Sequence, residues 1–271
     1  MEESKVIEMI KRNPSIITTI NNPTDEMKLL ALGRNGLLLK SIKNATKEMK
    51  ELALENNVRA IQYIDEPSEE MMIKAVKEGW SILDYIKNPT DNVIRLAIEK
   101  SGWAIQYVKN PSEDLQLLAV RKNYDSIKYI PNPCEKVQEE SVKISYDALR
   151  YIKSPSLNTQ LIAVKSNESA VRLIHDMNKE KSLEFLKVNI LVIKHISRDI
   201  QKEIELEDLQ SILKEVLSNE NVDEKYVRDF INCNVIDRNS DAFAMDKILF
   251  IHKYGSKRAK KIAVDEKLKI M

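Results

Sequence analysis

Several features that mark other protein classes are scarce or missing in this chain of 271 residues. Its only two cysteines, Cys134 and Cys233, are too few and too far apart for a disulfide framework or a zinc cluster. No apolar run approaches the roughly 18 residues that a membrane-spanning helix needs. The N-terminal residues show no basic segment followed by an apolar one, which a secretory signal would require. These absences predict a cytoplasmic protein without a membrane partner.

Motifs for catalysis or cofactor binding are missing as well. The chain has five glycines and no Gly-rich phosphate loop, nucleophile elbow or Cys/His constellation. Among its three histidines, His175 and His195 fall at nearby phases of the repeat described below and could approach one another. No third or fourth ligand accompanies them at metal spacing. The sequence therefore predicts a non-enzymatic protein with no catalytic residues, no metal and no cofactor.

What the chain does contain is a strict repeat of 22 residues. An aliphatic residue returns at this interval through most of the sequence: Ile20, Ile42, Ile64, Ile86, Val108, Ile130, Ile152, Ile174 and Ile196. Nine blocks follow one another without insertion or deletion, a regularity that chance does not produce. A short unit cannot bury its apolar face alone and must stack on its neighbours. The repeat predicts an all-α solenoid of about nine helix-turn-helix units over residues 1–197.

Each block predicts two short helices. Proline closes the preceding helix, and the Ser or Thr after it is a good N-cap for the next one. The first helix is expected over residues such as 69–78 and contains a small alanine that lets helices approach closely. The residues at the turn, such as Asn35 and Asn57, are expected to take a left-handed C-cap conformation. A second helix of about two turns follows, as in residues 103–108.

The last block is degraded, and the phase is lost after Ile196. Residues 198–271 predict four further helices, at about 199–218, 223–233, 240–254 and 256–269. This C-terminal region is expected to be either a cap over the last repeat or a small functional domain, because the end of an array needs cover.

Two stretches, Ala75-Val76 through Tyr85-Ile86 and Ala119-Val120 through Tyr129-Ile130, carry a pattern that resembles a known type of repeat. It is similar to the short helical-hairpin repeats of uncharacterised bacterial and bacteriophage proteins, over about residues 22–175. The resemblance implies a solenoid in the style of armadillo or HEAT arrays and implies no reaction. The phage association suggests inhibition of a host defence system by protein binding.

A ladder of tyrosines precedes the aliphatic row and is the first candidate for function: Tyr63, Tyr85, Tyr107, Tyr129 and Tyr151. In one interpretation, each ring packs between repeats while its hydroxyl finds water or a carbonyl. In the other, the ladder is an aromatic stripe for a protein partner or for stacked bases.

Trp80 and Trp103 lie at the turns of neighbouring repeats and are expected to pack in the core or at an edge. They become hot-spot candidates where exposed.

Two polar rows become basic toward the end of the array and are the second candidate. The last four members of the first row are Lys128, Arg150, Arg172 and Lys194. The corresponding members of the second row are Arg121, Lys143, Lys165 and Lys187. Lines of basic groups can track phosphates or an acidic protein face, although solvated helix faces look the same.

A basic run near the C-terminus is a weaker candidate for nucleic-acid contact: Lys257, Arg258, Lys260 and Lys261. Such a run can equally pair with the acidic helices before it. The net charge of +1 is small for a dedicated nucleic-acid binder. The sequence therefore favours a protein partner, keeps nucleic acid as the alternative, and leaves the oligomeric state open.

Overall fold

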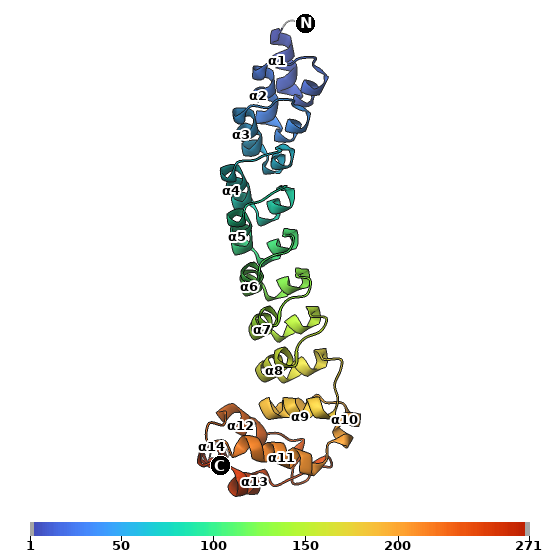
Figure 1. Ribbon diagram of the computed structural model, residues 1–271, viewed down its shortest axis with the longest axis vertical. Coiled ribbons are helices and arrows are strands. Elements are labelled where there is room, and N and C mark those ends of the chain that lie inside the picture. Colours follow the sequence, from blue (N-terminus) through green and yellow to red (C-terminus); the bar gives the residue numbers. More distant parts are fainter. Residues whose placement is uncertain (1–2, 269–271) are drawn as a thin grey trace. The chain divides into compact units, whose positions relative to one another are not determined.

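The computed structural model describes residues 3–268, and the chain divides into two compact units, Met1–Asn132 and Pro133–Met271. In the first unit, α helices alternate with short 3-10 helices (Figure 1). The α helices are α1 (Glu3–Arg12), α2 (Asp25–Arg34), α3 (Lys47–Asn56), α4 (Glu69–Glu78), α5 (Asp91–Lys100) and α6 (Glu113–Lys122). The 3-10 helices are η1 (Pro14–Thr19), η2 (Gly36–Ser41), η3 (Val58–Tyr63), η4 (Trp80–Tyr85), η5 (Gly102–Tyr107) and η6 (Tyr124–Tyr129).

The second unit continues the alternation and then departs from it. Its repeat helices are α7 (Glu135–Ile144), η7 (Tyr146–Tyr151), α8 (Leu157–Ser166), η8 (Glu168–Leu173), α9 (Lys179–Val188) and η9 (Ile190–Lys194). The remaining elements are α10 (Arg198–Glu203), α11 (Leu206–Leu217), α12 (Glu224–Ile231), β1 (Ile236–Asp237), β2 (Phe243–Ala244), α13 (Lys247–Tyr254) and α14 (Lys257–Leu268). Successive repeat helices pack within each unit, as α2 on α3 and α7 on α8. The predicted all-α, solenoid-like fold is confirmed.

The α helix of each repeat begins where the sequence predicts. In the first unit, the Thr24 side chain accepts a hydrogen bond from the Met27 amide, and Ser68 accepts one from Met71. This N-cap satisfies one of the amides that the first turn leaves without a helical partner. In the second unit Cys134 holds the same position, and no cap bond from its side chain is found.

The turn residues do not adopt the predicted left-handed conformation. Asn35 has φ −149° and ψ 94°, which is extended backbone, and its side-chain oxygen accepts the Leu37 amide. It is therefore the N-cap of a 3-10 helix, because an amide two residues ahead is within reach of so short a side chain. The left-handed positions are in the linkers instead: Asn22, Asn44, Asn110 and Asn132, with φ of 51–54°.

The second helix of each repeat, from η1 to η8, is a 3-10 helix of six residues. The helix predicted at residues 103–108 covers Gly102–Tyr107 in the structure. Such tight helices are stable only in short pieces, which suits a connection of this length. Their inner faces bury side chains such as Ala104 and Ile105 against the α helices. Their outer faces carry the tyrosines and the first basic row.

The C-terminal region packs on the last repeat. Helices α10 and α11 contact α9, and α12 contacts η9. The Tyr226 hydroxyl donates a buried hydrogen bond of 2.7 Å to the Leu186 carbonyl, and Lys179 pairs with Asp208 at 2.7 Å. The region thus covers the exposed face of α9, as the end of a repeat array requires. The boundary at 197/198 lies inside the second unit and stays a prediction.

Two of the four predicted C-terminal helices differ from the structure. The helix expected at 199–218 is broken at Ile204, because Glu205 starts a new helix with a capping box to Asp208. The helix expected at 240–254 begins at Lys247, after β2 pairs with β1 in a two-residue parallel ladder. Residue 269, the predicted end of the last helix, lies outside the described residues.

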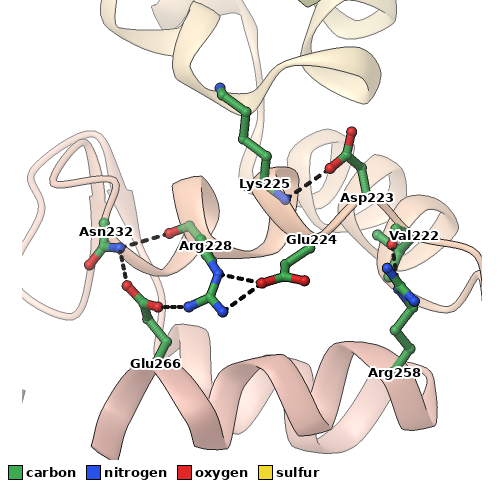
Figure 2. A network of polar contacts seen from close by, with 8 residues as sticks. All are labelled: Val222, Asp223, Glu224, Lys225, Arg228, Asn232, Arg258 and Glu266. Carbon is green, nitrogen blue, oxygen red and sulfur yellow. Dashed lines mark hydrogen bonds and ion pairs between the residues drawn. The ribbon is translucent and has the colours of Figure 1, made fainter. Parts of the chain in front are cut away.

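A polar network fixes α14 against α12 (Figure 2). Arg228 on α12 pairs with Glu224, one turn before it, at 2.6 Å and also with Glu266 on α14. At the other end of α14, Arg258 donates to the Val222 carbonyl at 3.0 Å. These contacts position the basic start of α14 on the surface of the second unit.

Candidate functional site

Aromatic residues are concentrated on the 3-10 helices of the first unit. Both tryptophans of the chain and five of its nine tyrosines lie on η3 to η6. None of the seven is fully buried: four are half-buried, and Tyr63, Trp103 and Tyr129 are exposed. Trp103 is 38% exposed, and Tyr129 is exposed to the same degree. Partly exposed tryptophan and tyrosine rings are enriched at interfaces, where one side is apolar and the other is wet.

Four of these rings form what we call the aromatic cluster: Trp80, Trp103, Tyr107 and Tyr129. The Trp80 ring meets the Trp103 ring edge to face, with centroids 6.4 Å apart, and lies 6.2 Å from the Tyr107 ring. The Lys128 ammonium links the fourth member, because it lies 5.6 Å from the Trp103 ring and 5.0 Å from the Tyr129 ring. Both distances are within the range of a cation–π interaction.

Asp125 fixes the orientation of the central indole. The Trp103 Nε1 donates to an Asp125 carboxylate oxygen at 2.8 Å, and Lys128 pairs with the same carboxylate at 2.9 Å. Partial burial raises the pKa of Asp125, but the hydrogen bonds from Lys128 and Trp103 outweigh it and bring the pKa below its ordinary value. The carboxylate therefore stays charged at neutral pH and holds the indole in one position.

The formal charges on η3 to η6 balance, since Arg59 and Lys128 are matched by Asp84 and Asp125. Arg59 lies 5.5 Å from the centre of the Tyr85 ring, so a second cation also packs on an aromatic face. A neutral, aromatic surface has the composition of a protein interface core. It lacks the basic excess that attracts a phosphate backbone.

The tyrosines of the predicted ladder are not equivalent. Tyr63 is 37% exposed and makes none of the ring contacts of the cluster. Tyr107 is half-buried, and this burial, with the nearby Asp84 charge, raises its pKa. Tyr151 is exposed on η7 in the second unit. The ladder therefore contributes to one site only through Tyr107 and Tyr129.

The first basic row is largely engaged in local contacts. Lys128 pairs with Asp125, and Arg150 pairs with Asp147 at 2.9 Å. Arg172 contacts the His195 Nδ1 at 3.1 Å. Burial and the Arg172 charge lower the pKa of His195, so its ring favours the neutral form. Lys194 is exposed and has no ion pair within residues 3–268.

The second basic row likewise contains both ion-paired and exposed members. Lys143 pairs with Glu139 at 3.5 Å, and Lys187 pairs with Glu184 and Glu215, each at 3.2 Å. The hydrogen bonds from Lys187 to these two carboxylates raise its pKa. Arg121 is exposed, as is Lys165, which forms no ion pair in the part of the chain that the structure describes.

The basic run on α14 does not pair with the acidic helices in the expected manner. Arg258 bonds a backbone carbonyl, not a carboxylate. Lys257, Lys260 and Lys261 are exposed, and their side chains form no ion pair within the described range. These three lysines, with Lys165 and Lys194, are among the exposed cations of the second unit that could contact an anionic partner.

Other types of site are not assembled by the described residues. Among residues 3–268, no three His, Cys, Asp or Glu side chains gather in a way that could hold a metal ion. No helix in that range has both the length and the apolar character needed to cross a membrane. Scans against protein-family models, curated proteins and solved structures found no match to this chain.

The residue that sequence reasoning missed is Asp125, whereas the tryptophans were named as hot-spot candidates where exposed, and Trp103 is exposed. A signal was available, because Trp103 and Asp125 are separated by 22 residues and so occupy the same place in successive repeats. Asp125 and Lys128, three apart, lie on one face of a 3-10 helix. Polar pairs at the repeat spacing therefore indicate contacts between neighbouring repeats.

Proposed function

We propose that this chain is a non-enzymatic, protein-binding repeat scaffold whose contact surface includes the aromatic cluster. The observation that carries the proposal is Trp103, an exposed indole held in place by Asp125 and Lys128. Tryptophan and tyrosine dominate interface hot spots, where they fill pockets of the partner. A side chain that is already fixed loses little conformational entropy on binding.

The test compares two substitutions that the repeat itself provides. Ser81 holds the position of Trp103 one repeat earlier, and Ser41 holds the position of Tyr63. Both Trp103→Ser and Tyr63→Ser are therefore expected to fold, and they remove aromatic rings of similar exposure. A pull-down from the source cells with the full-length chain, followed by mass spectrometry, identifies the partner. The purified partner is then titrated against each variant.

We expect Trp103→Ser to weaken binding by about tenfold or more, as for a hot-spot residue. Tyr63→Ser, outside the cluster, should bind like the parent chain. Equal affinity of all three proteins would remove the cluster from the proposal. Circular dichroism of both variants provides the control for folding.

The second candidate function is nucleic-acid binding, and it is favoured by the exposed lysines of the second unit. Lys165, Lys194 and the three lysines of α14 have no ion pair among the described residues. Phosphate contacts release counterions, so affinity for a duplex would fall steeply between about 50 and 200 mM salt. Gel shifts at these two concentrations separate the candidates, because binding through a neutral aromatic surface changes little with salt.

The partner in this proposal is a protein of the host cell, and the chain would act on it as an inhibitor or adaptor of bacterial or phage origin. The resemblance to phage-associated repeats suggests that role. We also propose a reducing, cytoplasmic location, which is consistent with neither Cys134 nor Cys233 forming a disulfide.

A further inference from the structure

Two pockets occupy equivalent places in the repeat, one in each unit. The pocket in the first unit has a volume of about 630 Å³, and the one in the second unit about 660 Å³. Each pocket lies between the ends of two successive 3-10 helices and the linkers that follow them. Four lining positions are the same in the two pockets, six repeats apart. They are Ile17, Ile20, Pro23 and Ser41 in the first unit, and Leu149, Ile152, Pro155 and Leu173, in the same order, in the second. Both volumes are in the range of ligand pockets.

Both pockets lie where the repeat lacks the ladder tyrosine. Five successive repeats carry tyrosine at the ladder position, from Tyr63 to Tyr151. Ser41 holds that position just before the ladder, and Leu173 holds it just after. Both residues line the pockets, and both are smaller than tyrosine. The places where the repeat omits the tyrosine therefore coincide with open space between linkers.

The pocket of the second unit combines an apolar wall with a basic rim. Leu149, Ile152 and Leu173 provide the wall, while Arg150 and Lys153 contribute positive charge. Arg150 uses its Nε to bond Asp147, which leaves the two terminal nitrogens of its guanidinium for a ligand. Lys153 is exposed and forms no ion pair within residues 3–268.

The other charged groups of this pocket do not cancel that positive charge. Asp176 also lines it, but Lys181 bonds this carboxylate at 2.6 Å and keeps its pKa low. His175 is at the rim and is exposed. The pocket therefore favours a ligand that combines an apolar group with an anion.

A buried acceptor adds a third requirement. Gln160 lines the pocket with only 3% of its surface exposed, and its Nε2 donates to the Pro155 carbonyl at 3.0 Å. Its Oε1 has no hydrogen-bond donor among the described residues. One repeat earlier, the Oε1 of Gln138 is satisfied by the Ser156 amide and the Thr159 hydroxyl. The Gln116 Oε1, two repeats earlier, lacks a donor within residues 3–268 as well, and both atoms are closed off from solvent. Buried acceptors without a donor are costly, so a ligand N–H group would be favoured here once the Gln160 side chain turns toward the pocket.

We propose that this pocket binds the carboxyl-terminal residue of a partner peptide whose last side chain is aliphatic. Such a residue presents the three features together: an apolar side chain against Leu149 and Leu173, a carboxylate at Arg150 and Lys153, and a backbone amide for Gln160. Arginine suits the carboxylate because its guanidinium can bond both oxygens. This site is in the second unit and is independent of the aromatic cluster.

The experiment titrates the full-length protein into a fluorescein-labelled hexapeptide, Gly-Ser-Gly-Ser-Gly-Leu, and follows fluorescence polarisation. The peptide with a free carboxylate should bind about tenfold more tightly than its amidated form, since it gains a charge-assisted hydrogen bond. A peptide ending in glycine should also bind more weakly. The proposal is overturned if the acid peptide does not bind at about 1 mM, a concentration that detects even weak complexes, or if acid and amide bind equally.

Three variants locate the binding site. Leu173→Tyr introduces the residue that five other repeats carry and should abolish binding. Arg150→Gln introduces the residue found at Gln62 and Gln106 and should weaken binding of the acid peptide about tenfold. Arg172→Gln changes the same row one repeat later, outside the pocket, and should have no effect. Unchanged binding by Leu173→Tyr or Arg150→Gln contradicts the assignment.

A final arm distinguishes a peptide from a small acylated amino acid. N-acetyl-leucine carries the same side chain, carboxylate and amide. If it binds more weakly than the hexapeptide, the longer chain contributes to binding and the peptide assignment holds. Equal affinity would show that a small molecule suffices and would overturn the peptide as the occupant.

Discussion

Single residues set how closely the two helices of neighbouring repeats approach, and Gly102 is the clearest case. A Cβ built at Gly102 would lie 2.2 Å from the Ala119 carbonyl oxygen, so no side chain fits without a backbone shift. Its amide donates to Asn123 at 2.8 Å, which holds η5 against the start of the next turn. This close approach places the adjacent Trp103 on the surface.

We expect Gly102→Ala to lower the free energy of unfolding by about 1–3 kcal/mol, the usual cost of overpacking. Gly79→Ala is the matched control, since the nearest atom to its added Cβ is a flexible Ile82 side chain at 4.0 Å. Its extended backbone accepts any residue, so this change should be neutral or add up to about 1 kcal/mol. Urea unfolding measures both, and equal effects of the two substitutions would contradict the close contact.

At the scale of elements, the sequence predicted the α helices of the repeats well and the 3-10 helices less well. Local chemistry determines an α-helix start, because Ser68 or Thr24 needs only the amide three residues ahead. The 3-10 helices depend on neighbours, as Gly36 shows by donating its amide to Asn56 of the next repeat at 2.7 Å. The aliphatic spacing indicated burial but did not distinguish a two-turn 3-10 helix from an α helix.

The docking of α12 on the last repeat depends on one buried hydrogen bond. Tyr226→Phe removes the hydroxyl that donates to the Leu186 carbonyl and leaves that buried acceptor unpaired. We expect a loss of about 1–3 kcal/mol in the free energy of unfolding, the cost of an unsatisfied buried group. Tyr63→Phe, at an exposed ring, should change stability by less than about 0.5 kcal/mol. A Tyr226→Phe protein as stable as the parent would show that the bond contributes nothing.

For the whole molecule, the sequence established the architecture, while the candidate site came largely from the structure. The 22-residue interval is written in the chain and determines which residues stack. The aromatic cluster depends on side-chain directions between repeats, and the spacing does not specify whether Lys128 turns toward Trp103 or toward solvent. The basic rows were evident in the sequence, but their pairing with Asp147 or Glu215 required coordinates.

A repeat array should respond locally to a local change, because each repeat is stabilised by its immediate neighbours. Hydrogen exchange read by mass spectrometry tests this in the full-length chain. Gly102→Ala should speed exchange most in the amides of α5 to η6, in the first unit, and Tyr226→Phe should speed it most in α9 to α12, in the second. Exchange reports the free energy of local opening, so each variant should leave the helices of the other unit near parent rates. A uniform increase across both units would mean that the chain unfolds as one cooperative body, and the nearest-neighbour description would then fail.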